Sequence, residues 1–156
     1  MIRELGKMRC LHPHSYLLMF LFLFFALPME TQSVEPIKLL LDFEDTDKSG
    51  RWMVVNDDVM GGVSRSNVKL HSDGYFLFGG EVSTNYGGGF ASVRTDYKNW
   101  EIEKYEGFIL RVKGDGKTYQ FRCRLGNNIN QIAYRHYFQA DNEDWQEIIL
   151  PFKEFL

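Results

Sequence analysis

Cysteine is scarce in this sequence, and its scarcity excludes a fold that depends on disulfide bonds. The 156 residues include two cysteines, and Cys10 lies in an N-terminal segment that we expect to be removed. The remaining thiol, Cys123, has no partner for an internal disulfide, so side-chain packing must stabilise the domain. Cys123 alternates with Phe121 and Leu125 on one face of an expected strand, which predicts a buried and unreactive thiol.

The sequence also lacks the residue patterns of common catalytic and cofactor sites. No Ser-His-Asp set or Cys-His pair is apparent, and His71 and His136 stand alone in expected strands. The glycine run 87–89 lacks the Gly-Lys-Ser/Thr ending of a phosphate-binding loop. Asp57 and Asp58 are neighbours on an extended chain and point to opposite faces, which is poor geometry for a catalytic carboxylate pair. We therefore expect no enzymatic activity and no cofactor.

A metal site is not expected either, although one alternative stays open. Asp45, Asp47, Ser49 and Gly50 form a D-x-D-x-S-G loop with oxygen ligands at calcium-like spacing. An EF-hand needs a bidentate Glu at the twelfth position of its loop, where this chain has Asn56. We therefore expect a polar turn, with calcium binding as the alternative.

An excess of basic residues is absent as well. The chain has 18 Lys and Arg against 21 Asp and Glu, and its formal net charge is −3. A net negative charge disfavours nucleic acid as a partner, because the phosphate backbone is itself anionic.

The N-terminal 33 residues have the features of a secretory signal peptide. Arg3, Lys7 and Arg9 precede an unbroken apolar run over residues 16–27. That run is too short to span a bilayer comfortably, which takes about 20 apolar residues. Small residues ahead of Val34 suit cleavage there, which predicts a secreted or periplasmic protein with one domain over residues 34–156. The alternative is an uncleaved segment that holds the protein at a membrane.

Strand patterns dominate the rest of the chain. Eight short β-rich segments are separated by turn residues, which favours an all-β antiparallel sandwich. The expected strands cover residues 37–43, 63–70, 75–82, 90–95, 106–113, 118–125, 132–138 and 146–150. Residues 97–105 are the one stretch that hints at a helical turn.

A basic face is expected on this acidic protein. Strands 106–113 and 118–125 are expected to form a consecutive pair around a Gly-Asp-Gly turn, and strict alternation places Arg111, Arg122 and Arg124 away from the core. If strand 132–138 pairs alongside, Arg135 and Tyr137 join the same face. Guanidinium groups bind carboxylates well, so these side chains are candidates for contact with a protein partner. The alternative is a solvated outer face.

The most specific local pattern runs from Trp52 to Ser64, WMVVNDDVMGGVS. It predicts a strand that enters a tight turn, because Asn and Asp cap turns and glycine tolerates positive φ.

Several separated motifs make the chain similar to the complex I intermediate-associated protein family. They are DVMGGVS (58–64), a Phe and Gly-Glu-Val-Ser patch (78–83), GGGFASVR (87–94), YEGFILRVKGDGKTYQFRCR (105–124) and WQEIILPFKEF (145–155). Several motifs in order are more specific than one short match. The signature residues are Asn56, Asp57, Asp58, Gly61, Gly62, Ser64, Gly88, Gly89 and Phe90, for which a structural role in turns is expected before ligand contact.

The resemblance implies a jelly-roll β-sandwich like that of galactose-binding domains, and chaperone-like work in assembling a protein complex. Modules that resemble this one usually continue past the last motif, so the chain is expected to lack C-terminal strands. We therefore expect a binding or assembly module for an envelope protein complex, with an unidentified protein partner and no membrane contact beyond an uncleaved signal segment. The alternative is a jelly-roll carbohydrate-binding module that holds a polysaccharide on exposed aromatic residues, with Trp100 and Tyr137 as candidates.

Overall fold

The protein is all-β in a computed structural model, which describes residues 4–12, 37–45, 49–126, 132–141 and 144–156. Its strands are β1 (Glu4–Leu11), β2 (Ile37–Leu41), β3 (Trp52–Asn56), β4 (Arg65–His71), β5 (Tyr75–Glu81), β6 (Ala91–Thr95), β7 (Gly107–Lys113), β8 (Lys117–Arg124), β9 (Ala133–Ala140) and β10 (Gln146–Pro151). Three short 3-10 helices complete the described elements: η1 (Asp57–Met60), η2 (Asn85–Gly87) and η3 (Phe152–Glu154). The eight expected strands and the strand that leads into the turn after Trp52 are confirmed. Residues 97–105 form no helix, but they include one hydrogen-bonded turn, in which the Tyr105 N–H donates to the Ile102 carbonyl at 3.0 Å.

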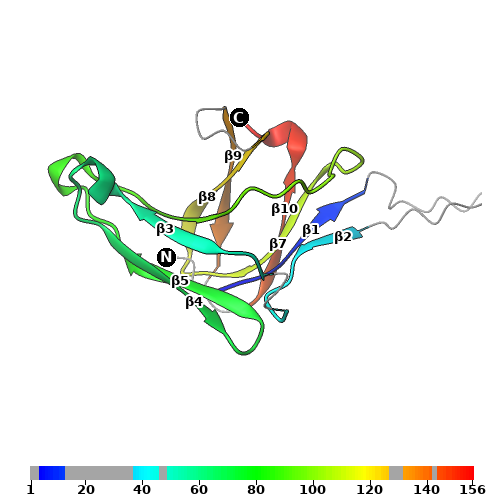
Figure 1. Cartoon of the computed structure of the whole chain (residues 1–156), viewed down its shortest axis with the longest axis horizontal. Coiled ribbons are helices and arrows are strands. Elements are labelled where there is room, and N and C mark those ends of the chain that lie inside the picture. Colours follow the sequence, from blue (N-terminus) through cyan, green and yellow to red (C-terminus); the bar gives the residue numbers. More distant parts are fainter. Residues whose placement is uncertain (1–3, 13–36, 46–48, 127–131, 142–143) are drawn as a thin grey trace, which may run out of the picture.

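The largest sheet has six strands in the order β10-β7-β1-β5-β4, with β2 also paired to β1. All of its pairings are antiparallel. One edge of β1 lies along β7, and the other edge pairs first with β5 and then with β2. β1 is therefore an interior strand, and it joins two halves of the sheet (Figure 1).

The domain was expected to start at Val34, but β1, which precedes that residue, lies inside the largest sheet. Gly6, Met8 and Cys10 are buried, while Lys7 and Arg9 alternate with them. The Lys7 Nζ lies 3.3 Å from a carboxylate oxygen of Glu44, and Arg9 pairs with Glu147, so two charges expected in a signal peptide take part in the fold. Basic residues ahead of an apolar run are the pattern of a signal peptide, which is why this segment was expected to be part of a leader.

The apolar run 16–27 and the expected cleavage site before Val34 lie outside the described residues. Cleavage therefore stays a prediction. Within the described ranges, no helix has the length and apolar character needed to cross a membrane.

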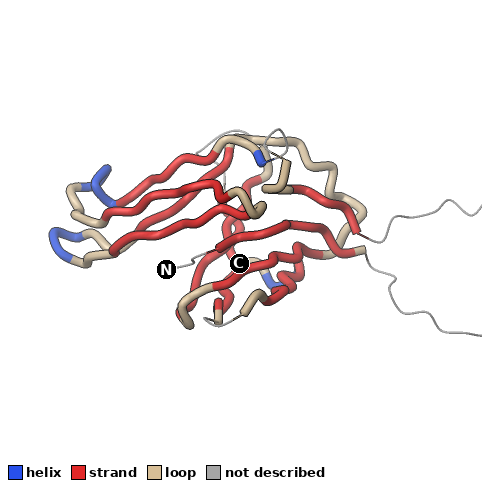
Figure 2. The backbone as a smooth tube through the Cα atoms, turned by 90° about the horizontal axis from the view of Figure 1, so that it is seen from below, coloured by secondary structure: helices blue, strands red, loops and turns tan. Residues whose placement is uncertain are grey.

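Two smaller sheets accompany the large one: β3 pairs with β6, and β8 pairs with β9. The expectation that 106–113 and 118–125 pair with each other is wrong. β7 pairs with β1 and β10, whereas β8 pairs with β9 in another sheet. The Gly-Asp-Gly turn therefore carries the chain between sheets, which alternation alone does not reveal. The antiparallel sheets fit the expected sandwich (Figure 2), and the jelly-roll topology stays a prediction.

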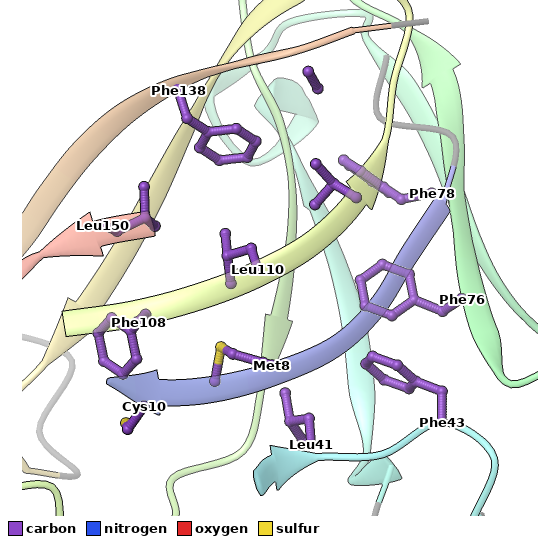
Figure 3. Close-up of a cluster of buried hydrophobic side chains, with 12 residues drawn as sticks. Met8, Cys10, Leu41, Phe43, Phe76, Phe78, Phe108, Leu110, Phe138 and Leu150 are labelled. Carbon is purple, nitrogen blue, oxygen red and sulfur yellow. The ribbon is translucent and has the colours of Figure 1, made fainter. Parts of the chain in front are cut away.

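The hydrophobic core lies between the sheets and draws on both ends of the chain. Met8 and Cys10 of β1 lie in one cluster with Phe76, Phe108 and other residues (Figure 3). Burial raises the pKa of the Cys10 thiol to about 12, so this thiol stays protonated at neutral pH. The expectation for Cys123 holds in part: it packs against the core and burial raises its pKa, but it is only half-buried.

Candidate functional site

The signature residues meet at one end of the molecule, in the two turns that contain η1 and η2. β3 leads into η1, and the chain from β5 to β6 passes through η2. Both turns lie side by side at the same tip (Figures 1 and 2). Two motifs that stand about 30 residues apart in the sequence are thus neighbours in space.

The Asp57 side chain connects these turns. It is fully buried. One carboxylate oxygen accepts a hydrogen bond from the Ser64 backbone N–H at 2.8 Å. The other accepts from the Ser64 hydroxyl, from the Gly89 N–H at 2.6 Å and from the Phe90 N–H at 3.2 Å. Asp57 therefore holds the turn after β3 against the glycine run before β6.

These hydrogen bonds set the charge of Asp57. Burial alone would raise the pKa of its carboxyl, but the bonds from Ser64, Gly89 and Phe90 outweigh burial and lower the pKa from 3.8 to about 2. The group is ionised at any physiological pH. A weak base whose oxygens already accept four hydrogen bonds is unsuited to proton transfer, so the arrangement is that of a structural clamp.

The glycines of both motifs make room for this carboxylate. A Cβ at Gly62 would lie 2.4 Å from the Asp57 Cγ, and a Cβ at Gly88 would lie 2.5 Å from an Asp57 carboxylate oxygen. Gly61 has φ +88°, which favours glycine, and its Cβ position faces open space. The sequence predicted turns here, but it did not show that both turns close on one side chain.

The remaining signature residues lie around the clamp. Asn56 accepts a hydrogen bond from the Ser66 hydroxyl at 2.5 Å, while the Asp58 side chain is exposed and accepts from the N–H of Val59. Ser83 was part of a motif but was not expected in the site. Its N–H donates to the Ser64 hydroxyl oxygen at 2.9 Å, which links the end of β5 to the clamp.

The outward side of the same tip is apolar. Val59, Met60 and Tyr86 are 70%, 71% and 80% exposed. Tyr86 also has φ 56°, an unusual value for a residue other than glycine. The sequence did not indicate that these three side chains are exposed.

The expected basic face is present on β8 and β9. Arg122 and Arg135 stand directly opposite each other, and Gln120 stands opposite Tyr137. Arg124 lies two residues beyond Arg122 on the same face. Tyr137 is 51% exposed, so its ring is available on this face.

Arg111 does not belong to that face. It lies on β7 in the large sheet, and its guanidinium carbon lies 4.4 Å from the centre of the Trp145 ring. Arg111 was assigned to the face because β7 and β8 were expected to pair. A cation–π contact with Trp145 accounts for its position instead.

Arg94 is a member of the basic cluster that the sequence did not indicate. It lies on β6 and is half-buried, and its Nε donates to the Ser92 hydroxyl at 3.2 Å. Burial lowers the pKa of Arg94, and the nearby charges of Arg124 and Arg122 lower it further. Only the packing of β6 near β8 could have revealed this neighbour.

Trp100 is not the exposed platform that was expected. It is half-buried and packs against the hydrophobic core, and its backbone carbonyl accepts a hydrogen bond from Lys38 at 2.8 Å. Its polar sequence neighbours suggested an exposed loop, whereas the indole ring is used for packing.

The calcium alternative falls partly on residues 46–48, which lie outside the described ranges. Among the residues that the structure does describe, no group of three or more His, Cys, Asp or Glu side chains is placed to hold a metal ion.

The sheets and the clamp define an all-β domain whose signature residues build two fixed turns. The family model of complex I intermediate-associated protein 30 (CIA30) matches residues 41–156, and the chain belongs to this family. No solved structure matches the chain. The matched range begins at the last residue of β2. β1 therefore lies outside the part of the chain that identifies the family.

Proposed function

We propose that the protein is a non-enzymatic module that binds a client protein and assists the assembly of a multi-subunit complex. The observation that carries this proposal is the role of the signature residues. They saturate a buried carboxylate with hydrogen bonds, which makes them scaffold residues rather than reactive groups. The family description supports complex I as the class of client.

The client-binding surface in this proposal is the outer face of β8 and β9, with Arg122, Arg124, Arg135 and Tyr137. We propose further that the protein works in a secreted or periplasmic compartment, on an envelope complex. The apolar run 16–27, which follows three basic residues, supports that location as an uncleaved export signal, because cleavage before Val34 would remove β1 from the large sheet. The burial of β1 in the large sheet argues for retention of at least residues 4–11 at the site of action.

Affinity capture tests this function. Tagged full-length protein is incubated with detergent-solubilised membranes of the source, and bound proteins and released glycans are identified by mass spectrometry. We expect enrichment of the subunits of one complex, lost in the Arg122→Glu, Arg124→Glu double variant. Arg65→Glu on β4 is the matched control, because Arg65 is also an exposed arginine on a strand.

Two outcomes would contradict the proposal. Enrichment of polysaccharide without protein would support the carbohydrate-binding alternative, for which Tyr137 is the remaining aromatic candidate. Equal capture by the wild type and the charge-reversed variant, both with unchanged melting temperature, would remove the outer face of β8 and β9 from the function.

A further inference from the structure

Positive charges from β6, β8 and β9 lie near one another: Arg122 stands opposite Arg135, and the charges of Arg124 and Arg122 act on Arg94. Among the described residues, no carboxylate forms an ion pair with Arg94, Arg122, Arg124 or Arg135, although other cations of the chain do have such partners. Arg122 and Arg135 are directly opposed across the strand pair, an arrangement that is destabilising for like charges. An acidic protein that gathers four cations in this way has a local excess of positive charge.

The cluster has both an inner and an outer part. Arg94 is half-buried on β6, and its Nε donates to the Ser92 hydroxyl. The N–H groups of its two terminal nitrogens can therefore donate to a ligand. Arg122 and Arg124 are exposed on β8. A hollow of about 360 Å³ adjoins the cluster and is lined by Arg122, Arg135, Ile132, Ala133 and Leu156. An anion that enters this hollow would meet the guanidinium groups of Arg122 on β8 and Arg135 on β9.

We propose that Arg94, Arg122, Arg124 and Arg135 form a binding site for the carboxylates of an extended acidic segment of the client. The site rests on the proposed function, because it assigns the chemistry of the client contact. The inner Arg94 holds one carboxylate, and the exposed arginines hold its neighbours along the segment.

Strand geometry favours an extended segment over a single small anion. Arg122 and Arg124 are two residues apart on one face, which separates them by about 6.6 Å along the strand. Carboxylates at alternate positions of an extended segment have the same spacing. Within the described strands, β8 pairs only with β9 and β6 only with β3, so each has an edge without a strand partner. Addition of a strand at such an edge is a common mode of peptide recognition.

The test uses full-length protein and two synthetic peptides of equal length and composition. One peptide alternates Glu and Thr, and the other carries the same Glu residues in one block. Binding is measured by fluorescence anisotropy at about 0.05 M and 0.2 M salt. We expect the alternating peptide to bind more tightly, and its affinity to fall with salt.

Single-residue variants test whether the peptide binds at the four arginines. Arg122→Gln and Arg94→Gln should each weaken binding of the alternating peptide about tenfold, the loss expected for one hydrogen-bonded charged group. Arg65→Gln should leave binding unchanged. Because Arg94 is half-buried, its variant counts only if its melting temperature matches the wild type, and the exposed Arg122 provides the second variant.

Several results would overturn this site. Equal affinity for both peptides would show attraction to charge alone. Stronger binding of inorganic phosphate or of a single-stranded oligonucleotide would assign the arginines to phosphate groups. Absence of peptide binding while the envelope complex is still captured would reject this inference alone, whereas peptide binding without capture of any complex would count against the proposed function.

Discussion

Asp57 is a single side chain on which two distant motifs depend. It is ionised and enclosed, and its four donors come from both sides of the tip. Each donor would lose its partner if the carboxylate were removed, and a buried donor without a partner is costly. The negative charge at position 57 is therefore a structural requirement, although in the sequence it resembles half of a catalytic pair.

We expect Asp57→Asn to lower stability, and the loss to depend on pH. The folded pKa of about 2 lies below the ordinary 3.8, so the native state binds fewer protons than the unfolded chain. This stabilisation is complete above about pH 4 and disappears as the pH falls through about 2. Urea unfolding from pH 2 to pH 7 should show wild type and variant diverging as the pH rises through that window.

Asp58→Asn is the matched control for that experiment. The Asp58 side chain is exposed and accepts from the N–H of the next residue, which an amide oxygen can also do. Its unfolding curves should coincide with those of the wild type. A gap between Asp57→Asn and wild type that stays constant down to pH 2 would contradict the assignment of the effect to ionisation.

The two consecutive glycines after η1 have different roles in the turn, and alanine substitutions should distinguish these roles by their effects on stability. At Gly61 the backbone has φ +88° and open space, so Gly61→Ala should cost about 1 to 2 kcal/mol, the penalty of a left-handed conformation. At Gly62 a Cβ would lie 2.4 Å from the Asp57 Cγ, so Gly62→Ala must displace the clamp itself. Chemical denaturation should rank Gly62→Ala as the more destabilising variant, and the reverse order would mean that the clamp yields easily.

The positions of the strands could be predicted from the sequence, but the pairing between strands could not. Short alternating runs such as those of β4, β8 and β9 located the elements, because side chains on a half-buried strand must alternate. Pairing between strands is decided by contacts distant in sequence, so the chain gave no sign that β7 pairs with β1 and β10. The same limit applied to the site. Turn residues identified the tip, whereas the convergence on Asp57 and the nearness of Arg94 to β8 needed the fold.

At the scale of the whole molecule, the large sheet depends on a strand from the extreme N-terminus. β1 separates β7 from β5 and β2, and its Met8 and Cys10 lie in the common core. Without β1, the backbone groups along one edge each of β7 and β2 would lose their partners, and the core would lose two buried side chains. Exposed strand edges of this kind pair with other chains.

We therefore expect the chain that starts at Val34 to fail to fold alone. It should show no cooperative thermal transition, whereas the full-length protein should show one. Co-expression with a separate peptide of residues 1–12 should restore a soluble complex, because the peptide can occupy the position between β7 and β5. A peptide with Met8→Asp is the control, since a carboxylate in the core should prevent rescue. A chain from Val34 that unfolds cooperatively at the full-length melting temperature would show that β1 is dispensable, and would favour removal of the signal segment before the protein acts.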